Sequence, residues 1–338
     1  MARIALDAMG GDHAPRAPVA GALLALAELD TAHTVQLVGR TAVIMAELDA
    51  LLGGELAHLA TLRSRLDVIE APDVIAMSDK ASVAIRGKLQ SSMVIGLRLQ
   101  VDGRSDAFVS AGNTGAQMAA SKDILSLHPG LRRPAISTVF PTARESVVVV
   151  DSGANVDCSA EELVQFARLG AVYAEDILGR GHPSVGLLSI GEEAEKGNKV
   201  VKEAHQLLRC AGLNFHGNVE GRDVLAGASD RGPIDVVVCD GFVGNVLLKF
   251  YEAVGPMMLA WLVASGYDGD ALRQVFAPLD YSERGGAPLL GVQGVSIISH
   301  GKSSAQAIKN AIMVALLAVD TRLSEHIGRR LIGSGASA

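Results

Sequence analysis

Short apolar runs rich in β-branched residues alternate, along almost the whole chain, with longer segments whose apolar residues recur at helical spacing. This alternation is typical of a parallel or mixed sheet covered by helices. The apolar runs predict strands at 3–8, 34–39, 66–71, 106–111, 135–140, 145–151, 184–191, 213–219, 234–240 and 295–300. The helical spacing predicts helices at 17–29, 81–101, 159–178, 197–211 and 303–319.

Two predicted strands, 135–140 and 145–151, follow one another with only "PTAR" between them. They predict a hairpin or a crossing between lobes. The chain has no linker rich in Ser, Gly or Pro that would separate independent domains, and no repeat of fixed period. We therefore expect one α/β unit with two lobes around a cleft: lobe A from about 1–140 and 285–338, and lobe B from about 141–284.

Composition supports this class and excludes others. The chain has 338 residues, of which 49% are hydrophobic and 20% charged, so it can bury a large core. Its net charge of -7 argues against a general nucleic-acid binder. The cysteines Cys158, Cys210 and Cys239 lack metal or redox spacing and are expected to be buried and reduced. The N-terminus reads as a strand and not as a signal peptide, which favours a cytoplasmic protein.

Polar turns close several of the predicted strands. Strand 106–111 runs into "GNTGA" (112–116), where glycines and free helix-start amides favour an anion, although simple capping by Asn113 or Thr114 explains the residues equally well. The turns "DSGANVD" (151–157), "GEEAEKGN" (191–198) and "CDGFVGN" (239–245) follow three further strands. Because ligands collect at the carboxyl ends of strands in open α/β sheets, these turns predict a shared active-site cleft.

The first turn, "DAMGGDHAP" (7–15), has three possible interpretations: a metal site, a phosphate-binding turn, or a tight polar turn. The histidines His13, His216 and His300 have no metal-like spacing, and we expect no metal and no cofactor. The stretch "HGKSS" (300–304) is similar to a P-loop but has Ser296 where that motif needs glycine. Fingerprints for dinucleotides, serine nucleophiles and zinc proteases are absent from the sequence.

Two surface features need an explanation. A basic cluster is more often a solvated helix face, but this one could dock an acidic partner; it consists of Arg86, Lys88, Arg98, Arg132 and Arg133. The apolar stretch 253–267 holds the only tryptophan and is too short to span a bilayer. Core packing is its default interpretation, and contact with a membrane or a partner is the alternative.

Six blocks in order carry a family resemblance: "IALDAMGGDHAP", "SAGNTGA", "DSGANVDC", "IGEEAEKGN", "VVVCDGFVGNVLLK" and "GGAPLLGVQG". They resemble the PlsX family, the phosphate acyltransferases of bacterial phospholipid synthesis, from Ile4 to about Val319. Ala76 and Ala81 stand where the family usually has Gly and Pro, and "SDRGPID" adds residues before a strand, so local loop shape can differ.

The resemblance implies transfer of an acyl group from acyl carrier protein to inorganic phosphate. It also implies an isocitrate/isopropylmalate dehydrogenase-like, three-layer α/β/α fold, a homodimer, and peripheral attachment to the inner face of the cell membrane. The acyl phosphate would then feed a glycerol-phosphate acyltransferase in the membrane.

Phosphate is itself the nucleophile in this reaction, so the site must hold a dianion and stabilise an oxyanion. The residues expected to act in catalysis are Asn113, Asp151, Asn155, Glu193, Lys196, Asp240, Asn245 and His300. Those expected to contact substrate are Asp7, Gly10, Gly11, His13, Ser110, Gly112, Thr114, Gly115, Gly241 and Phe242. Within these sets, Asn113, Thr114 and Lys196 suit the phosphate, and Asn155 and Asn245 suit the oxyanion. Asp151, Glu193 or Asp240 could orient a phosphate proton, and His300 or His13 could protonate the thiolate.

The basic cluster is the candidate docking site for the acidic carrier protein. The candidate membrane contacts are Met257, Met258, Leu259, Trp261, Leu262 and Val263. Three alternatives remain open: a phosphotransacetylase acting on acyl-coenzyme A, a magnesium-dependent decarboxylating dehydrogenase on the same fold, and a membrane-associated scaffold without activity.

Overall fold

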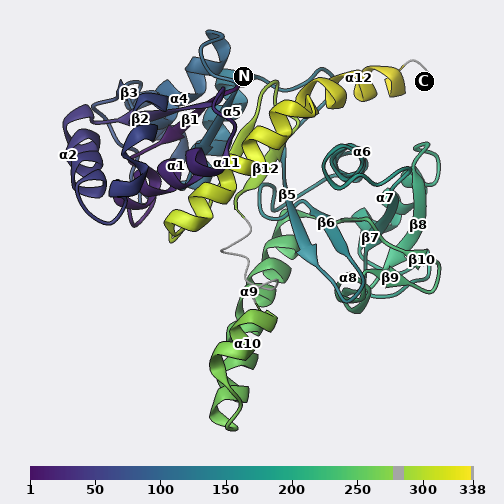
Figure 1. Cartoon of the computed structure of the whole chain (residues 1–338). Coiled ribbons are helices and arrows are strands. Elements are labelled where there is room, and N and C mark those ends of the chain that lie inside the picture. The colour runs from purple at the N-terminus through teal and green to yellow at the C-terminus, as the bar shows by residue number, and fades with distance from the viewer. Residues whose placement is uncertain (277–284, 336–338) are drawn as a thin grey trace. The chain divides into compact units, whose positions relative to one another are not determined.

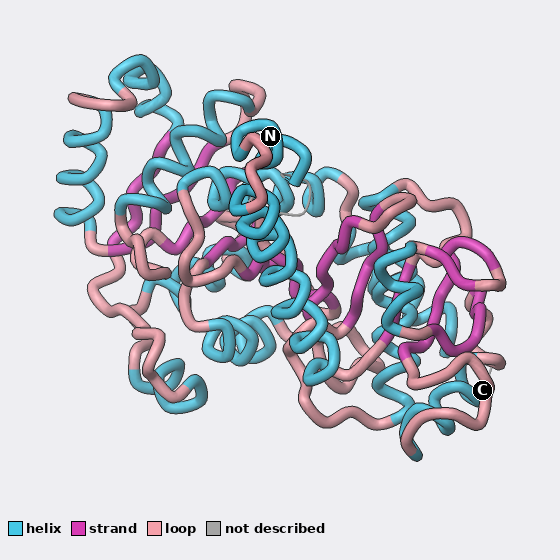
Figure 2. Tube along the Cα trace, turned by 90° about the horizontal axis from the view of Figure 1, so that it is seen from below, coloured by secondary structure: helices cyan, strands magenta, loops and turns pink. Residues whose placement is uncertain are grey.

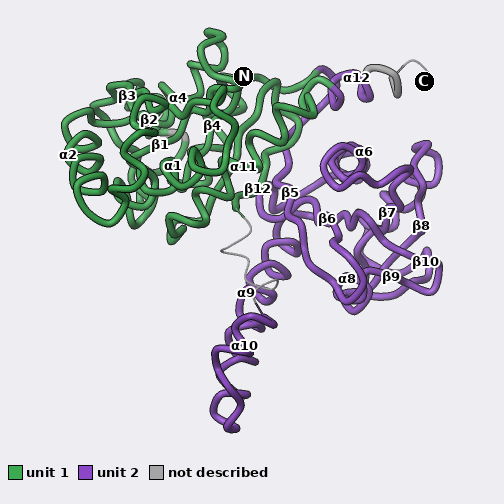
Figure 3. Tube along the Cα trace, viewed as in Figure 1, with its two compact units in different colours: residues 1–128, 282–325 green, residues 129–281, 326–338 purple. Residues whose placement is uncertain are grey.

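The structure is a computed structural model that describes residues 1–276 and 285–335. It comprises two compact units, coloured separately in Figure 3. Unit 1 contains Met1–His128 and Ser282–Glu325, and unit 2 contains Pro129–Tyr281 and His326–Ala338. The sequence predicted that residues 129–140 and 326–338 belong to lobe A, whereas they belong to unit 2. The division into two lobes around a cleft stays a prediction.

Unit 1 carries one strand layer (Figure 1). Its strands are β1 (Arg3–Asp7), β2 (Thr34–Gly39), β3 (Leu66–Glu70), β4 (Ala107–Ser110), β12 (Ala287–Leu290) and β13 (Ser296–Ile298). Its helices are α1 (Arg16–Glu28), α2 (Thr41–Leu52), the 3-10 helix η1 (Ala57–Arg65), α3 (Ala81–Gly87), α4 (Ser92–Val101), α5 (Thr114–Leu125) and α11 (Ala305–Asp320). Helix α12 (Leu323–Gly335) begins here and continues into unit 2.

Neighbouring strands of unit 1 follow the order β3-β2-β1-β4-β13-β12, parallel except for the β13–β12 pair. Alternate side chains of each strand point to opposite faces. Ile4 and Leu6 join a core with α1 and α11, whereas Phe108 packs closely against Gly96 of α4 on the other face. Unit 1 therefore has three layers, with helices on both sides of its strands (Figure 2).

Unit 2 also carries a strand layer. Its strands are β5 (Ala135–Pro141), β6 (Ser146–Val150), β7 (Ser184–Leu188), β8 (Asn214–Val219), β11 (Val236–Val238) and the short pair β9 (Ala228–Ser229) and β10 (Gly232–Pro233). Its helices are α6 (Ala160–Leu178), α7 (Lys199–Leu208), α8 (Gly221–Ala226), α9 (Gly241–Ala264) and α10 (Gly269–Phe276). The main order is β5-β6-β11-β7-β8, in which only the β5–β6 pair is antiparallel.

The helices of unit 2 also cover both faces of its strands. Gly170 of α6 packs closely on Val150 and Val236, so α6 lies against one face. Leu248 and Tyr251 of α9 pack against the other face, in a core cluster that includes Val149 of β6 and Val237 of β11. This arrangement confirms the expected three-layer α/β/α architecture within the unit.

The sequence predicted most elements of this fold. Every strand predicted from an apolar run is present, and the two runs around "PTAR" form the antiparallel β5–β6 hairpin. The predicted helix 81–101 is wrong as a single element, because α3 ends at Gly87 and α4 begins at Ser92. Strands β9, β10 and β12 were not predicted, since they are short and lie among Gly, Pro and polar residues.

The expectation that the apolar stretch 253–267 is too short to span a bilayer needs correction. Residues 253–264 of this stretch form the second half of α9, which has 24 residues and is long and apolar enough to cross a membrane by length and composition. Only 17% of its most apolar window is buried in the structure, so core packing, the default interpretation, is wrong for most of this helix. The expected burial of the cysteines holds for Cys239 but not for Cys210, which is exposed.

Candidate active site

Three strand ends of unit 1 lie side by side, because β1, β4 and β13 are adjacent and parallel. The backbone ties the turns that follow them together. The amide of Asp12 donates to the Gly301 carbonyl at 2.7 Å, and the amide of Ser299 donates to the Ser110 carbonyl at 2.8 Å. The turns "DAMGGDHAP", "GNTGA" and "HGKSS" therefore form one polar edge of unit 1.

Asp7, at the end of β1, is buried beneath this edge. Its carboxylate accepts a hydrogen bond from the Ser110 hydroxyl at 2.7 Å and another from the Met9 amide at 3.1 Å. Burial raises the pKa of the Asp7 carboxyl, while hydrogen bonds from Ser92 and Ser110 oppose the rise. The Ser110 hydroxyl also accepts from the Gly112 amide at 2.9 Å, so Asp7 and Ser110 link the first turn to the second.

The glycines of the first turn are required by this packing. A Cβ atom at Gly10 would stand 2.6 Å from an Asp7 carboxylate oxygen and 2.8 Å from the Gly112 amide nitrogen. Gly11 has a φ of 100°, which side chains disfavour, and lies against the Gly301 carbonyl. The close backbone approach is thus made to neighbouring turns, and contact of these glycines with substrate stays a prediction.

Asn113 caps α5, since its Oδ1 accepts from the Ala116 amide at 3.0 Å. Its Nδ2 donates to the carbonyls of Ala76, Met77 and Asp79 at 3.0 to 3.3 Å. Asn113 therefore holds the segment 76–79 beside the helix start. No local pattern predicts this contact, because 76–79 and Asn113 lie far apart along the chain.

The remaining predicted residues of unit 1 are exposed. Thr114 and Gly115 begin α5, where the first backbone amides have no intrahelical partner. The side chains of His13 and His300 are also exposed, and Nδ1 of His300 accepts from the Lys302 amide at 3.1 Å. These groups, unlike Asn113, are accessible to a ligand without rearrangement.

In unit 2, the Asp151 carboxylate organises the turn after β6. It accepts from the backbone amides of Ile136, Gly153, Ala154 and Asn155 and from the Asn155 side chain, at 2.7 to 3.1 Å. Burial raises the pKa of Asp151, and these donors oppose the rise. A carboxylate with so many donors holds its turn, and the predicted proton-orienting role stays a prediction.

The Asn155 side chain also has its hydrogen-bond donors occupied within the turn. Its Nδ2 donates to the Pro134 carbonyl and to Asp151, both at 2.8 Å, so both amide hydrogens have partners. Its backbone carbonyl accepts from the Gly241 amide at 2.7 Å. In this structure Asn155 therefore fastens the turn to the start of α9, and its role as oxyanion donor stays a prediction.

The start of α9 presents the other predicted residues of this turn. Asp240 caps the helix by accepting from the Val243 amide at 2.8 Å. Phe242 and Asn245 are exposed, and a Cβ atom at Gly153 would stand 3.6 Å from the Asn245 side chain. No hydrogen bond from the Asn245 amide is recorded to the described residues, so this side chain can still donate to a ligand.

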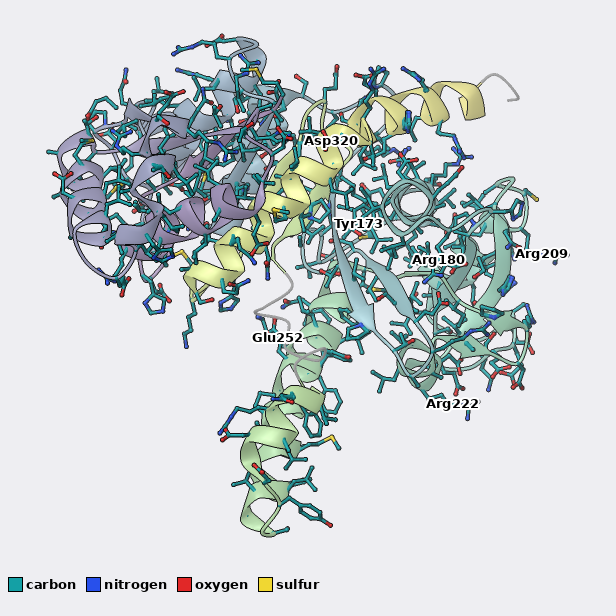
Figure 4. All side chains as sticks on the ribbon, in the orientation of Figure 1. Tyr173, Arg180, Arg209, Arg222, Glu252 and Asp320 are labelled. Atoms are coloured by element: carbon teal, nitrogen blue, oxygen red, sulfur yellow. The ribbon has the colours of Figure 1, made fainter. Side chains whose placement is uncertain are left out.

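Glu193 and Lys196 lie in the segment after β7, and both side chains are exposed. The Glu193 carbonyl accepts from Nδ2 of Asn218 at 2.7 Å, and Oδ1 of Asn218 lies 2.9 Å from Nδ1 of His205. Arg222, labelled in Figure 4, reaches the same segment through an ion pair with Glu192 at 3.3 Å. The sequence did not predict Asn218, His205 or Arg222, because none of them lies in the polar turns that it singled out.

The predicted site residues thus form two groups, one in each unit. Each group is brought together by adjacent strand ends of its own unit. The predicted shared cleft stays a prediction. Within the described residues, no group of three or more His, Cys, Asp or Glu side chains has the arrangement of a metal site.

The residues of the predicted basic cluster differ in whether their charges have acidic partners. Lys88 donates to Asp79 at 2.6 Å and to the Val74 carbonyl at 2.8 Å, and this contact lowers the pKa of Asp79. Arg133 pairs with Glu162 at 3.1 Å, and Arg132 lies 3.7 Å from Glu161. Arg86 and Arg98 are exposed, and no ion pair joins them to the described residues.

The apolar face of α9 includes the predicted membrane-contact residues. Met257, Met258, Trp261 and Val263 are between 41% and 63% exposed, while Leu259 and Leu262 are half-buried. Met257, Met258, Trp261 and Leu262 line a cavity of about 900 Å³ within unit 2, together with residues of α8 and the β5–β6 hairpin.

The three-layer α/β/α architecture and the polar strand ends define the class of protein. It is an α/β protein of the isocitrate/isopropylmalate dehydrogenase-like fold. A phosphotransacetylase from Streptococcus pyogenes is similar, with a TM-score of 0.63, 17% identity and 94% of both chains covered. A putative 4-hydroxythreonine-4-phosphate dehydrogenase from Salmonella typhimurium has a TM-score of 0.53 at 14% identity, covering 94% of this chain and 99% of that one. At these identities the likenesses show the fold alone.

The sequence narrows this class to one family. Residues 2–326 match the model of the fatty acid synthesis protein family, and the chain belongs to that family, which confirms the resemblance to PlsX proteins. The phosphate acyltransferase of Heliobacterium modesticaldum is 46% identical over 340 residues, covering 96% of this chain and 97% of that protein. The phosphate acyltransferase of Desulforamulus reducens is 46% identical over 341 residues, covering 98% of each.

Proposed function

We propose that this protein transfers an acyl group from acyl carrier protein to inorganic phosphate and releases acyl phosphate and free carrier protein. Its relatives over nearly the whole chain are phosphate acyltransferases. The observation that carries the proposal is the polar edge of unit 1, where Asp7, Ser110 and Asn113 fix the turns around a helix start with free amides. Anion binding at such a start is what a phosphate substrate requires.

The chemistry follows from the substrates. A phosphate oxygen attacks the thioester carbonyl, a C–O bond forms, the C–S bond breaks, and the thiolate takes the electron pair and then a proton. No nucleophilic side chain is needed, so the protein must position phosphate and stabilise the developing oxyanion. The amides of Thr114 and Gly115 and the ammonium of Lys196 suit the phosphate. The free amide of Asn245 suits the oxyanion better than that of Asn155, whose hydrogens are occupied.

The reaction is tested directly with purified protein, acyl-acyl carrier protein and phosphate. Acyl phosphate is trapped with hydroxylamine as the hydroxamate, and the released carrier thiol is counted in parallel. Equal amounts of both products, dependent on phosphate, are expected. Thiol release without hydroxamate would indicate simple hydrolysis and contradict the proposal.

The alternative substrate is an acyl-coenzyme A thioester. Similarity of fold to a phosphotransacetylase does not decide between the two carriers. The same assay with both thioesters at equal concentration gives the ratio of their kcat/KM values. We expect a higher value for acyl carrier protein, and the opposite order would favour the phosphotransacetylase alternative.

We further propose that the protein acts in the cytoplasm as a homodimer attached peripherally to the inner face of the cell membrane, where a glycerol-phosphate acyltransferase consumes its product. Support comes from α9, whose apolar side chains are exposed around Trp261. The helix also carries Lys249 and Glu252, which pair at 2.8 Å. A helix with an apolar stretch and a charged pair suits contact at the membrane interface.

The membrane proposal is tested by flotation with vesicles that contain anionic lipid. Leu262→Asp together with Val263→Asp places charge on the apolar face and should abolish flotation. Leu207→Asp, at a similarly exposed position on α7, is the matched control and should float like the wild type. Retained flotation of the double variant would contradict the membrane role. Sedimentation of the same proteins tests the dimer independently.

A further inference from the structure

A second cavity lies wholly within unit 2, apart from the apolar face of α9. Its volume is about 770 Å³, within the range of small-molecule binding sites. It is lined by the ends of β7 and β11, the start of α7 and the segment after Asn155. Asp240 and Asn198, which belong to the predicted site turns, both border it. We call it the β7–α7 cavity.

The lining of the β7–α7 cavity is mainly apolar. Its apolar lining residues include Leu163, Leu187, Leu188, Val201 and Val243. Cys158 and Cys239 also line it. Burial raises the pKa of Cys158 to about 12 and that of Cys239 well above its ordinary value, so both remain neutral thiols and poor nucleophiles.

Charge in the lining excludes a phosphorylated ligand. Asp157 and Asp240 are the ionisable carboxylates at its border, and no described lining residue is basic. The diphosphate of coenzyme A or the phosphate that joins a carrier protein to its prosthetic arm would meet repulsion here. The occupant is therefore an uncharged part of the substrate.

The substrate has two uncharged parts, the pantetheine arm and the acyl chain. The number of free hydrogen-bonding groups in the lining decides which of them the cavity suits. Oδ1 of Asn198 already accepts from the Val201 amide at 2.9 Å, and Oδ1 of Asp240 accepts from Val243. The Ser189 hydroxyl is buried without a recorded partner among the described residues. Asp157 and Asn198 are exposed and Asp240 is half-buried, so they border the cavity opening. Its buried part therefore offers one free hydroxyl to the two amides of a pantetheine arm, whereas a hydrocarbon chain needs no partner.

We infer that the β7–α7 cavity receives the acyl chain of the thioester substrate. The inference rests on the proposed function for the identity of the substrate. It places the chain beside Asp240 and the segment that carries Lys196, so that the thioester end emerges at the strand ends of unit 2. The depth of the cavity then sets which acyl chains the enzyme accepts.

The experiment changes the depth of the cavity at Val201, which is half-buried on α7. Val201→Phe fills the cavity and Val201→Ala enlarges it. Butyryl-pantetheine and lauroyl-pantetheine serve as substrates, since they lack carrier protein and phosphate. The measured quantity is the ratio of kcat/KM for lauroyl to that for butyryl. Loss of room for two methylene groups corresponds to about a tenfold fall in that ratio for Val201→Phe.

The matched control is Leu207→Phe, which adds the same ring to the same helix outside the lining. Its ratio should equal that of the wild type. A ratio unchanged in both Val201 variants, or a rate lost equally for both thioesters, would overturn the inference. If Val201→Phe fails to fold, as judged by thermal unfolding, Val201→Ala decides alone: its ratio must rise for the inference to hold.

Failure of the proposed function is distinguishable from failure of this inference. If the wild type makes no hydroxamate from any thioester, the transferase proposal fails. Binding of lauroyl-pantetheine to the same variants, followed by calorimetry, still tests the cavity. Affinity that falls about tenfold in Val201→Phe and not in Leu207→Phe supports an acyl-chain site, and equal affinity in all three proteins excludes it.

Discussion

Gly244, in the first turn of α9, lies directly against the carbonyl oxygen of Asp151. A Cβ atom at this position would overlap that oxygen, and it would also stand 3.1 Å from the Cys239 sulfur. Gly241 is crowded as well, since a Cβ there would lie 2.8 Å from the Asn155 backbone. The turn "DSGAN" and the helix start "DGFVGN" therefore interlock through their glycines.

Gly244→Ala should destabilise the protein strongly. The overlapping atom is backbone and cannot rotate away, so the free energy of unfolding should fall by about 3 kcal/mol, the upper end for overpacking. Urea unfolding measures the change. Gly221→Ala is the matched control in the first turn of α8, where a Cβ would meet nothing within 4 Å. It should change stability by less than about 0.5 kcal/mol. Equal stability of both variants would contradict the interlock.

The sequence predicted the strand ends, because apolar runs followed by Asp, Gly and Asn are local signals. It could not predict that Gly241 and Gly244 serve helix-to-turn packing, since the partner residues at 151–155 lie about ninety positions earlier and the contact depends on the sheet order. The same limit applies to Asn155. Its position in a polar turn indicated function, but only the structure shows that both its amide hydrogens are occupied.

Asn113 caps α5 and also holds the segment 76–79, and two variants distinguish these roles. Asn113→Ser retains a helix cap but loses the donors to the carbonyls of 76–79, whereas Asn113→Ala loses both. We expect Asn113→Ala to be less stable than Asn113→Ser by about 1 kcal/mol, the usual value of a cap. Both should show faster hydrogen exchange in 76–80 than the wild type. Slow exchange in this segment in both variants would mean that Asn113 does not hold it.

Asn218 should position the segment that carries Glu193 and Lys196. Because its Nδ2 donates to the Glu193 carbonyl, its Oδ1 faces Nδ1 of His205, which then carries the proton. Asn218→Ala leaves both partners unsatisfied and should cost about 1–3 kcal/mol of stability. If Lys196 binds phosphate, the KM for phosphate should also rise several-fold while the KM for acyl thioester changes little.

The matched control for Asn218 is Asn214→Ala, on the same strand β8. The Asn214 side chain donates to the His182 carbonyl at 3.2 Å, away from the Glu193 segment. This variant should leave the KM for phosphate unchanged. A rise in both variants, or in neither, would remove Asn218 from the positioning role.

The buried carboxyl of Asp7 should make stability depend on pH. Burial raises its native pKa above the ordinary 3.8, so the native state keeps a proton that the unfolded chain has lost. The stability from Asp7 is thus complete below pH 3.8 and is lost as the pH rises through the native pKa. The free energy of unfolding of Asp7→Asn, measured in urea from acid to neutral pH, should lack this decline. Parallel curves for the two proteins would show that Asp7 does not titrate in this way.

The sequence located the candidate carrier-docking residues but could not rank them. Lys88 was grouped with Arg86 because both are basic, yet its ammonium is committed to Asp79 and to the backbone of 74. A ranking of these cations depends on which of them already have partners, and the partners of Lys88 lie nine and fourteen residues away along the chain. The structure leaves Arg86 and Arg98 as the exposed cations of unit 1 in this group.

Charge reversal at these two positions should therefore act on carrier docking alone. Arg86→Glu with Arg98→Glu should raise the KM for acyl-acyl carrier protein about tenfold at low salt, and by less at high salt, because exposed charges are screened. The kcat/KM for lauroyl-pantetheine and the KM for phosphate should stay unchanged, since neither substrate carries the acidic protein. Lys88→Glu, in contrast, also disrupts the segment that Asn113 holds and should affect all three substrates. A KM for acyl carrier protein that is unchanged in the double variant would place the docking surface elsewhere.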